Sequence, residues 1–369
     1  MIWLHAFVIL ALGGRGTDIH SSSPLQSSQM TKLPESEVPY LRGPLEFYPI
    51  SSSQLILFTT PAEQQKAKKL DGVHVRTLHA FRVDLTTHAV GRIPELENAV
   101  SEWPWFGYSV SPNGRSLICV PIDQKHPGRC VDLKSLASSP IDLMVNSAVV
   151  WSPDSRSFLD IANQGRIDRL NRFFEVEPSK ENSFVSRDMS PSLNGDLMAG
   201  ASLGVPLRFK SDNTVIYLSS SSFFDAGKMH QAMDIHEFKF VNMRLEQGDS
   251  FSFDPPDMRI YHDYVRVNAQ GTRLLWHGLK QASSHQQSWC LYTSNLDGSQ
   301  IVQLESIPIV GEVNRGTTMP PDPTNPDVLQ THIGPIFGAE WMPDGKTICF
   351  FSEGEFHEVV DTSVAGISR

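Results

Sequence analysis

A short hairpin motif near the end of the chain constrains the fold more than any other feature of the sequence. It spans Ala339–Glu353 and places Pro343, Asp344 and Gly345 between two apolar segments. Proline sets φ for the first central position of a type I turn, and aspartate tolerates the second. Glycine readily adopts the left-handed conformation that follows. The motif therefore predicts two antiparallel strands joined by a tight, bulged turn.

The strand after this turn is apolar without interruption. Thr347–Phe351 lacks the alternation of polar and apolar residues that marks a strand with one face in water. A continuous apolar run indicates a strand that is covered on both faces. The middle strands of propeller blades have this property, because each blade is packed between two neighbouring blades.

Similar hairpins recur along the chain. Five further copies, some lacking the proline or the glycine, are Phe47–Phe58, Tyr108–Val120, Val149–Leu159, Leu207–Leu218 and Val265–Trp276. A second, more alternating pair of strands follows several of them, as in Phe81–Val90 and in Leu291–Val302 with its Asp-Gly turn. Two inner and two outer strands make a four-stranded antiparallel blade.

The distance between turns indicates the blade size. Pro112 and Pro153 are 41 positions apart, which suits four short strands of about 40 to 45 residues in total. Later turns are farther apart, which predicts inserted loops at Pro178–Gly204, Ser221–Pro256 and Glu305–His332. Such insertions often carry the binding face. A strand within residues 40–47 is expected to complete the last blade and close the ring.

Three of the turns carry a resemblance to a known family. Ser111–Gly114, Ser152–Ser155 and Met342–Gly345 resemble the WD40-like repeats of TolB-type β-propellers. The resemblance implies an all-β fold over residues 40–369, a six-bladed propeller with seven blades as the alternative. It implies little about function, because the motif builds the scaffold. Such propellers occur as periplasmic interaction modules, as lid domains of prolyl-oligopeptidase-like peptidases and as oligogalacturonate-lyase-like enzymes.

The N-terminus forms a separate segment. The apolar run Ile2–Leu12 is too short to span a bilayer as a helix, and no stable membrane span is expected. Its length and composition predict a signal peptide over residues 1–14 and export to the periplasm or the medium. No Lys or Arg precedes the run, so a cytoplasmic location is the alternative. Residues 15–39 are Ser-rich and aperiodic, which predicts a disordered leader.

Charge narrows the class of partner. The formal net charge is -10, and acidic and basic residues are scattered along the chain. A nucleic-acid partner is excluded, because affinity for phosphate backbones rests largely on Lys and Arg. A protein or a saccharide is the expected partner, and the chain itself is expected to be a monomer.

The chain has four cysteines. Cys119 and Cys130 flank a turn around Lys125–Gly128, so they could face each other across a hairpin and form a disulfide after export. The favoured interpretation is that both are buried as small apolar residues. No Cys-x-x-Cys pair is present, which argues against a structural zinc site.

One segment matches a catalytic motif. Gly200–Gly204 has the Gly-x-Ser-x-Gly pattern of a nucleophile elbow. That elbow needs a strand before it and a helix after it, whereas Val205–Phe209 has a strand pattern. A loop of small residues between blades is therefore favoured over a nucleophile.

Histidines and aromatic residues supply the remaining candidates. Loop histidines at one end of a propeller channel can converge on a metal; those considered are His230, His236, His262, His277, His285 and His332. None has the spacing of a local ligand pair, and ordinary surface or hydrogen-bonding roles are favoured. The aromatic cluster of Trp103, Trp105 and Phe106 fits a core better than a sugar-stacking surface. Trp151 and Trp341 occupy equivalent repeat positions, and packing explains them.

The sequence assigns no catalytic, cofactor-binding or metal-ligating residue and no cofactor. The favoured hypothesis is a non-enzymatic, exported propeller that acts as a protein-interaction or ligand-binding platform. The alternative is a carbohydrate-active propeller enzyme, similar to oligogalacturonate lyases, with a histidine-built metal site at the channel mouth.

Overall fold

The fold is taken from a computed structural model of the whole chain. The structure describes residues 28–32, 46–59, 68–70, 73–101, 107–121, 127–143, 147–162, 172–176, 184–188, 202–225, 228–255, 258–283, 286–309, 336–352 and 355–361. Strands dominate these residues, and no α-helix occurs among them.

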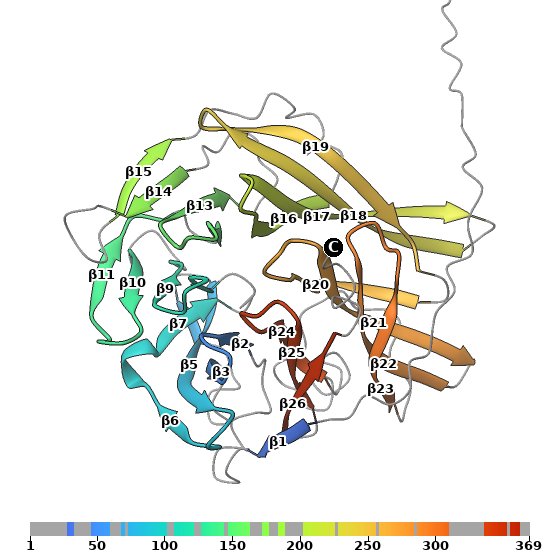
Figure 1. The fold of residues 1–369 in the computed structure, drawn as a ribbon, viewed down its shortest axis with the longest axis horizontal. Helices are drawn as coiled ribbons and strands as arrows, with labels where there is room; N and C mark the ends of the chain where they lie inside the picture. The colour runs from blue at the N-terminus through green and yellow to red at the C-terminus, as the bar shows by residue number, and fades with distance from the viewer. Residues whose placement is uncertain are drawn as a thin grey trace, which may run out of the picture.

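Six antiparallel sheets are arranged as blades around a central axis, so the fold is all-β and the propeller has six blades (Figure 1). The innermost strands of blades 1 to 6 are β2 (Glu46–Pro49), β8 (Tyr108–Val110), β12 (Ser147–Trp151), β16 (Ser202–Phe209), β20 (Met258–Val267) and β24 (Ile336–Trp341). The second strands are β3 (Gln54–Thr59), β9 (Ser116–Cys119), β13 (Ser157–Ala162), β17 (Thr214–Asp225), β21 (Arg273–Ser283) and β25 (Thr347–Ser352).

The third strands are β5 (Val73–Asp84), β10 (Gly128–Asp132), β14 (Arg172–Val176), β18 (Lys228–Val241), β22 (Gln286–Asn295) and β26 (Glu355–Val360). The outermost strands are β6 (Val90–Arg92), β11 (Ser138–Ile141), β15 (Phe184–Asp188), β19 (Arg244–Phe253), β23 (Val302–Ile309) and β1 (Ser28–Lys32). In blade 1, β4 (Lys68–Leu70) and β7 (Asn98–Ser101) pair with the first half of β5, and the 3₁₀ turn Pro94–Leu96 precedes β7.

The core consists of one apolar cluster at each contact between blades. Phe47 of blade 1 packs with Phe356 of blade 6, and Leu117 of blade 2 packs with Phe58 of blade 1. Four more clusters join blades 2 to 3, 3 to 4, 4 to 5 and 5 to 6. In β25, Ile348–Ser352 are all buried, because both faces of this strand contact apolar neighbours. The prediction that a continuous apolar run is covered on both sides is confirmed.

The ring is closed by an N-terminal strand that lies earlier than predicted. β1 pairs antiparallel with β26, with Ser28 opposite Glu358 and Lys32 opposite Glu355. The predicted closing strand at residues 40–47 is therefore wrong, and Glu46–Pro49 instead forms the innermost strand of blade 1. β1 also falls inside the segment predicted as a leader, while the other residues before Glu46 lie outside the described part of the chain.

A second difference concerns the predicted insertion at Ser221–Pro256. This region is built from long strands, because β17 and β18 pair continuously from Thr214 opposite Lys239 to Asp225 opposite Lys228. β19 adds a fourth strand along β18. The extra length of blade 4 therefore lies in a hairpin that extends beyond the ring (Figure 1). The insertions predicted at Pro178–Gly204 and Glu305–His332 lie mostly outside the described residues.

Cys119 and Cys130 are not paired, although they lie on neighbouring strands. In the register of β9 and β10, Cys119 is opposite Arg129 and Cys130 is opposite Ile118. The two side chains therefore point to opposite faces of the sheet, where Cys119 packs toward blade 1 and Cys130 toward blade 3. All four cysteines are free and buried, which agrees with the favoured interpretation.

The thiols are expected to be inert in the folded protein. Burial raises the pKa of Cys119 to about 11 and that of Cys130 to about 12, so almost no reactive thiolate forms at neutral pH. Ellman's reagent should titrate almost no thiol in native protein and all four in urea. Rapid reaction of one thiol in the native state, or a lower melting temperature on reduction, would contradict this arrangement.

Candidate functional site

Equivalent residues of the six innermost strands can be identified by their distance from the tight turn that follows each strand. At each turn the backbone N–H of one residue donates to a carbonyl across the hairpin; these donors are Ile50, Ser111, Ser152, Lys210, Asn268 and Met342. The residues two positions earlier are Tyr48, Ser109, Val150, Arg208, Arg266 and Glu340. We call this set the inner ring position. The turns after Ile50 and Lys210 are one residue shorter than the other four, but in every blade the residue lies at the same distance before its turn, so these residues share one face of their strands and one level of the propeller.

The innermost strands contact one another around the ring in blade order, and β2 also contacts β24. Neighbouring turns are joined as well. The amide of Asn268 donates to the carbonyl of Gly345 at 3.3 Å, and the backbone N–H of Asn113 donates to the hydroxyl of Ser155 at 3.0 Å. The inner ring position is therefore held by a rigid frame.

Three charged residues, from three consecutive blades, occupy the inner ring position. Arg266 Nε donates to Glu340 Oε1 at 2.5 Å, and Arg266 Nη1 donates to the carbonyl of Val265 at 3.0 Å. Side-chain exposure is 36% for Arg266 and 18% for Glu340. The pair thus links blade 5 to blade 6 in a partly desolvated place, where Coulomb interactions are stronger than in water.

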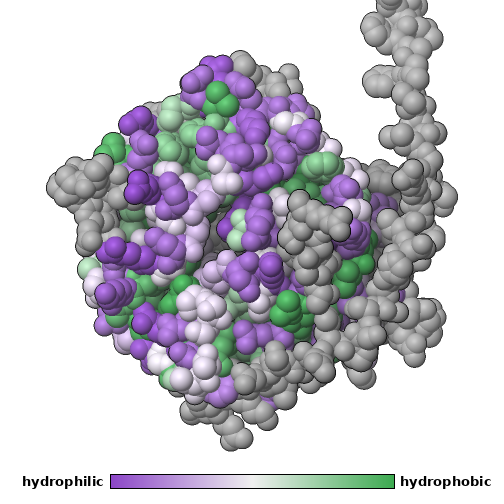
Figure 2. All heavy atoms as spheres, viewed as in Figure 1, coloured by the Kyte–Doolittle hydropathy of each residue, from purple (hydrophilic) through white to green (hydrophobic). Residues whose placement is uncertain are grey.

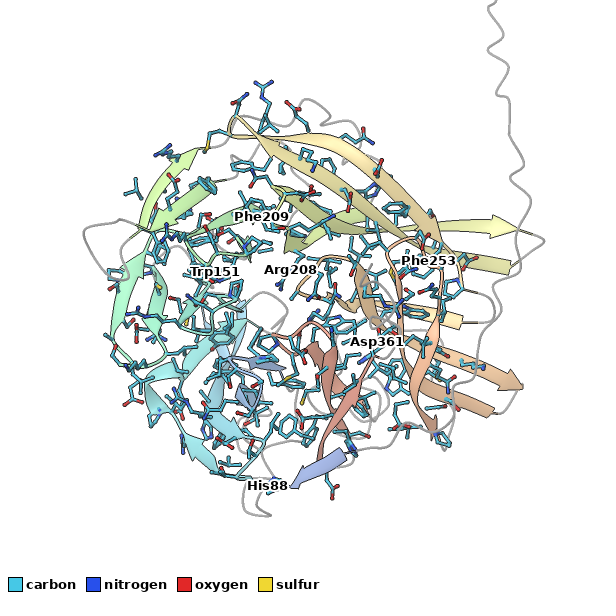
Figure 3. All side chains as sticks on the ribbon, in the orientation of Figure 1. His88, Trp151, Arg208, Phe209, Phe253 and Asp361 are labelled. Atoms are coloured by element: carbon cyan, nitrogen blue, oxygen red, sulfur yellow. The ribbon has the colours of Figure 1, made fainter. Side chains whose placement is uncertain are left out.

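Arg208 of β16 completes this charged group and lies near the centre of the ring (Figure 3). Its side chain is half-buried, and its Nε is buried without a hydrogen-bond partner in the described part of the chain. Burial lowers the pKa of this guanidinium, and Glu340 opposes that shift. Burial raises the pKa of Glu340, and the positive charges of Arg266 and, to a smaller extent, of Arg208 oppose this rise. The three groups therefore interact electrostatically, with one positive charge in surplus.

The surface view agrees with this placement. Figure 2 shows a largely hydrophilic face that is hollowed near the centre of the ring. Within the described ranges, no three His, Cys, Asp or Glu side chains gather closely enough to hold a metal ion. The chemistry that the described centre offers is ionic recognition by two guanidinium groups and one carboxylate.

Of the six candidate histidines, two have described side chains, and these lie on different blades. His236 of β18 hydrogen-bonds through Nε2 to Ser219 at 2.9 Å and through Nδ1 to Ser250 at 3.0 Å. Burial lowers its pKa, opposed by Asp234. His277 of β21 is buried in blade 5. These two do not converge, and the side chains of His230, His262, His285 and His332 lie outside the described part of the structure.

Three other sets of residues are candidates from the sequence: the serine of the Gly-x-Ser-x-Gly motif, the repeat tryptophans and the aromatic cluster. Ser202 begins β16, so a strand follows this serine where a nucleophile elbow would need a helix. Trp151 and Trp341 are buried at the contacts between blades, as packing predicted. Trp103, Trp105 and Phe106 lie outside the described residues. No helix among the described residues is long and apolar enough to cross a membrane.

His277 gives the structure a pH dependence that can be measured. Burial, and secondarily Arg266, lower its pKa to about 3 from the model-compound value of 6.5. As pH falls below 6.5, the unfolded chain takes up a proton that the folded chain rejects. Stability that is complete above this pH is therefore lost progressively toward pH 3, at up to about 1.4 kcal/mol per pH unit. Urea unfolding between pH 7 and 4 measures this loss.

The matched variant for that measurement is His277→Gln. Glutamine is neutral in both states, so the variant should lose this part of the pH dependence between pH 6 and 4. An unchanged slope would show that other groups account for it. Above pH 7, where the imidazole is neutral in both states, the pH profiles of the two proteins should be parallel.

Comparisons with known proteins do not assign a family. No protein-family model matches the chain, and no curated protein matches it. Solved structures that resemble it include the propeller domain of the Trilobed protease from Pyrococcus furiosus, at 15% identity and TM-score 0.37, covering 84% of this chain and 80% of that chain. The structure of putative TolB from Agrobacterium tumefaciens has 12% identity, TM-score 0.37 and coverages of 72% and 88%.

The periplasmic gluconolactonase of Pseudomonas aeruginosa is a further similar structure, at 14% identity and TM-score 0.36, covering 90% of this chain and 79% of that chain. At such identities and TM-scores the likeness carries no argument about activity, partner or location. The assignment of a six-bladed propeller rests on the six sheets themselves.

Proposed function

We propose that this protein is a non-enzymatic binding platform and that its ligand, a protein or a saccharide, binds at the mouth of the central channel. The observation that carries the proposal is the convergence of Arg208, Arg266 and Glu340 from three consecutive blades on one level of the ring. A rigid frame that presents fixed charges in a partly dry place favours recognition, because little conformational freedom is lost on binding.

The test is a binding screen with a matched pair of variants. Defined glycans and peptides are presented to the wild type and to a channel variant carrying Arg208→Gln, Arg266→Gln and Glu340→Gln. A control variant carries Arg187→Gln, Lys239→Gln and Glu175→Gln, which changes the net charge equally at exposed positions on outer parts of blades 3 and 4. The proposal expects ligands that bind the wild type and the control but not the channel variant.

The same ligands separate binding from catalysis. Ligands that bind the wild type are incubated with it for a long period and then recovered. If the protein is non-enzymatic, they should be recovered intact. Release of a cleaved product would contradict the proposal and favour the carbohydrate-active alternative. Equal binding by the wild type and the channel variant would show that the ligand does not bind at the channel mouth.

Export and a monomeric state belong to the same proposal. The apolar run Ile2–Leu12 supports a signal peptide. Expression in a secreting bacterial host, followed by N-terminal sequencing of the exported protein, should give a mature chain that starts near residue 15. Retention of the full chain in the cytoplasm would favour the alternative location. Light scattering of the exported protein should give the mass of one chain.

A further inference from the structure

The charges at the inner ring position do not balance. Arg266 is engaged by Glu340 and by the carbonyl of Val265, so this carboxylate is largely used by one of the two arginines. Arg208 contributes the surplus positive charge. The chain as a whole has a net charge of -10, so a cationic centre runs against the protein's overall charge.

Arg208 is placed where an unbalanced charge is costly. It is half-buried on β16, and its Nε is shielded from solvent and has no hydrogen-bond partner within the described residues. A desolvated guanidinium is stabilised when an anion accepts hydrogen bonds from its planar fork. The residue points to the centre of the ring (Figure 3), where a ligand entering the channel would meet it.

We propose that Arg208 binds the carboxylate of a monoanionic ligand that enters the central channel. A carboxylate is planar and matches the two parallel N–H groups of a guanidinium. Its single charge equals the surplus at the inner ring position. A phosphate dianion would exceed that surplus and would lie near Glu340, which disfavours it through like-charge repulsion. Glu340 thus acts as a selectivity residue, and Arg266 holds it in place.

This inference rests on the proposed function and narrows it to a ligand class. The carboxylate can come from a sugar acid or from the C-terminus of a peptide. Calorimetric titration of the full chain with glucuronate and with N-acetyl-triglycine, which are both monoanions at neutral pH, distinguishes these sources. Glucose and N-acetyl-triglycine amide are the uncharged counterparts, and inorganic phosphate tests selectivity. Ligands of this size are expected to bind with dissociation constants of the order of 1 mM.

The variants give effects of opposite sign. Arg208→Gln should weaken binding of the carboxylate probe by about 10- to 100-fold, the range for losing a charge-assisted hydrogen bond. Arg208→Lys keeps the charge but loses the fork, so it should bind with intermediate affinity. Glu340→Gln adds a positive surplus and should tighten binding and admit phosphate. Arg187→Gln, at an exposed pair on β15, should leave affinity unchanged.

The melting temperatures of the same variants show whether a loss of binding is caused by a loss of folding. Arg208→Gln removes a poorly compensated charge, so its melting temperature should equal or exceed that of the wild type. The inference is overturned if neither carboxylate binds more tightly than its uncharged counterpart. It is also overturned if Arg208→Gln, with an unchanged melting temperature, retains full affinity. If the wider screen finds channel-dependent ligands while the carboxylates fail, the ligand class is wrong and the platform stands. If the screen also finds none, both are wrong.

Discussion

Replacing Asp361 with alanine is expected to lower the free energy of unfolding by about 3 to 5 kcal/mol, the largest effect of any single substitution considered. Asp361 follows β26 in blade 6 and accepts from Arg273 Nε of blade 5 at 3.1 Å (Figure 3). Both side chains are 2% exposed. Removing the carboxylate leaves a buried guanidinium without its counter-charge, and water does not reach it easily.

The remaining partners of Arg273 do not replace that charge. Its two other guanidinium nitrogens donate to Asn295 and Thr293 at 2.9 Å, which are neutral acceptors in the same blade. Asp361→Asn keeps the shape and one acceptor, so it should lose less than Asp361→Ala. Urea unfolding at pH 7, followed by tryptophan fluorescence, measures all variants.

An exposed ion pair supplies the control for this prediction. Glu175 pairs with Arg187 at 2.9 Å with side chains 43% and 62% exposed. Glu175→Ala should cost no more than about 1 kcal/mol, because solvent screens the pair. Equal losses for Asp361→Ala and Glu175→Ala would show that the pair between blades 5 and 6 is not desolvated as the structure indicates.

Replacing Gly114 with alanine should destabilise the protein by roughly 2 to 5 kcal/mol, and the same change at Gly345 by about 1 to 2 kcal/mol. Both glycines occupy equivalent turn positions with φ of 67°, so the conformational cost of alanine is the same at both positions. A Cβ at Gly114 would lie 1.9 Å from the carbonyl oxygen of Ile50, which is backbone of the neighbouring blade. That backbone moves only with its strand.

The Cβ at Gly345 would instead lie 2.0 Å from Oε1 of Gln270, at the end of an exposed, flexible side chain. Gln270 can adopt another rotamer at small cost. Asn213 and Ser155 occupy the same turn position in other blades with φ near 60°, so a side chain is tolerated there when it has room. Thermal and urea unfolding of the two variants should therefore differ clearly. Equal losses would mean that the contact with Ile50 relaxes readily.

The hairpins could be predicted from sequence because turn chemistry is local. The Pro-Asp-Gly turn at Met342–Gly345 connects β24 and β25, and weaker copies such as Lys210–Asn213 connect strands in the same way. The number of blades followed from counting these turns, and the strand order followed from the short connections. The predicted outer turn at Leu296–Gly298 connects β22 and β23.

The closing strand and the charged centre could not be found in this way. The sequence of β1, Ser28–Lys32, contains no turn motif of the kind that marks the hairpins, and its partner β26 lies at the other end of the chain. Arg208, Arg266 and Glu340 belong to different repeats, and only ring closure brings them together. A usable signal does exist, since aligning the six turns places these residues in one column two positions before the first hydrogen bond of each turn. The candidate histidines give no guide to this centre, because His236 and His277 are strand residues on separate blades; ordinary roles are the favoured interpretation for them.

The pairing of β1 with β26 also has a consequence for biosynthesis. Ser28 and Glu358 lie at nearly opposite ends of the chain, yet they meet in one blade. Because the N-terminus is synthesised first, almost the whole polypeptide must be made before this contact can form. Contacts between residues so far apart in sequence also form slowly. Until then the growing chain presents the unsatisfied backbone groups of an open sheet edge. We therefore expect this protein to depend on chaperones during translation more than a helical protein of equal length.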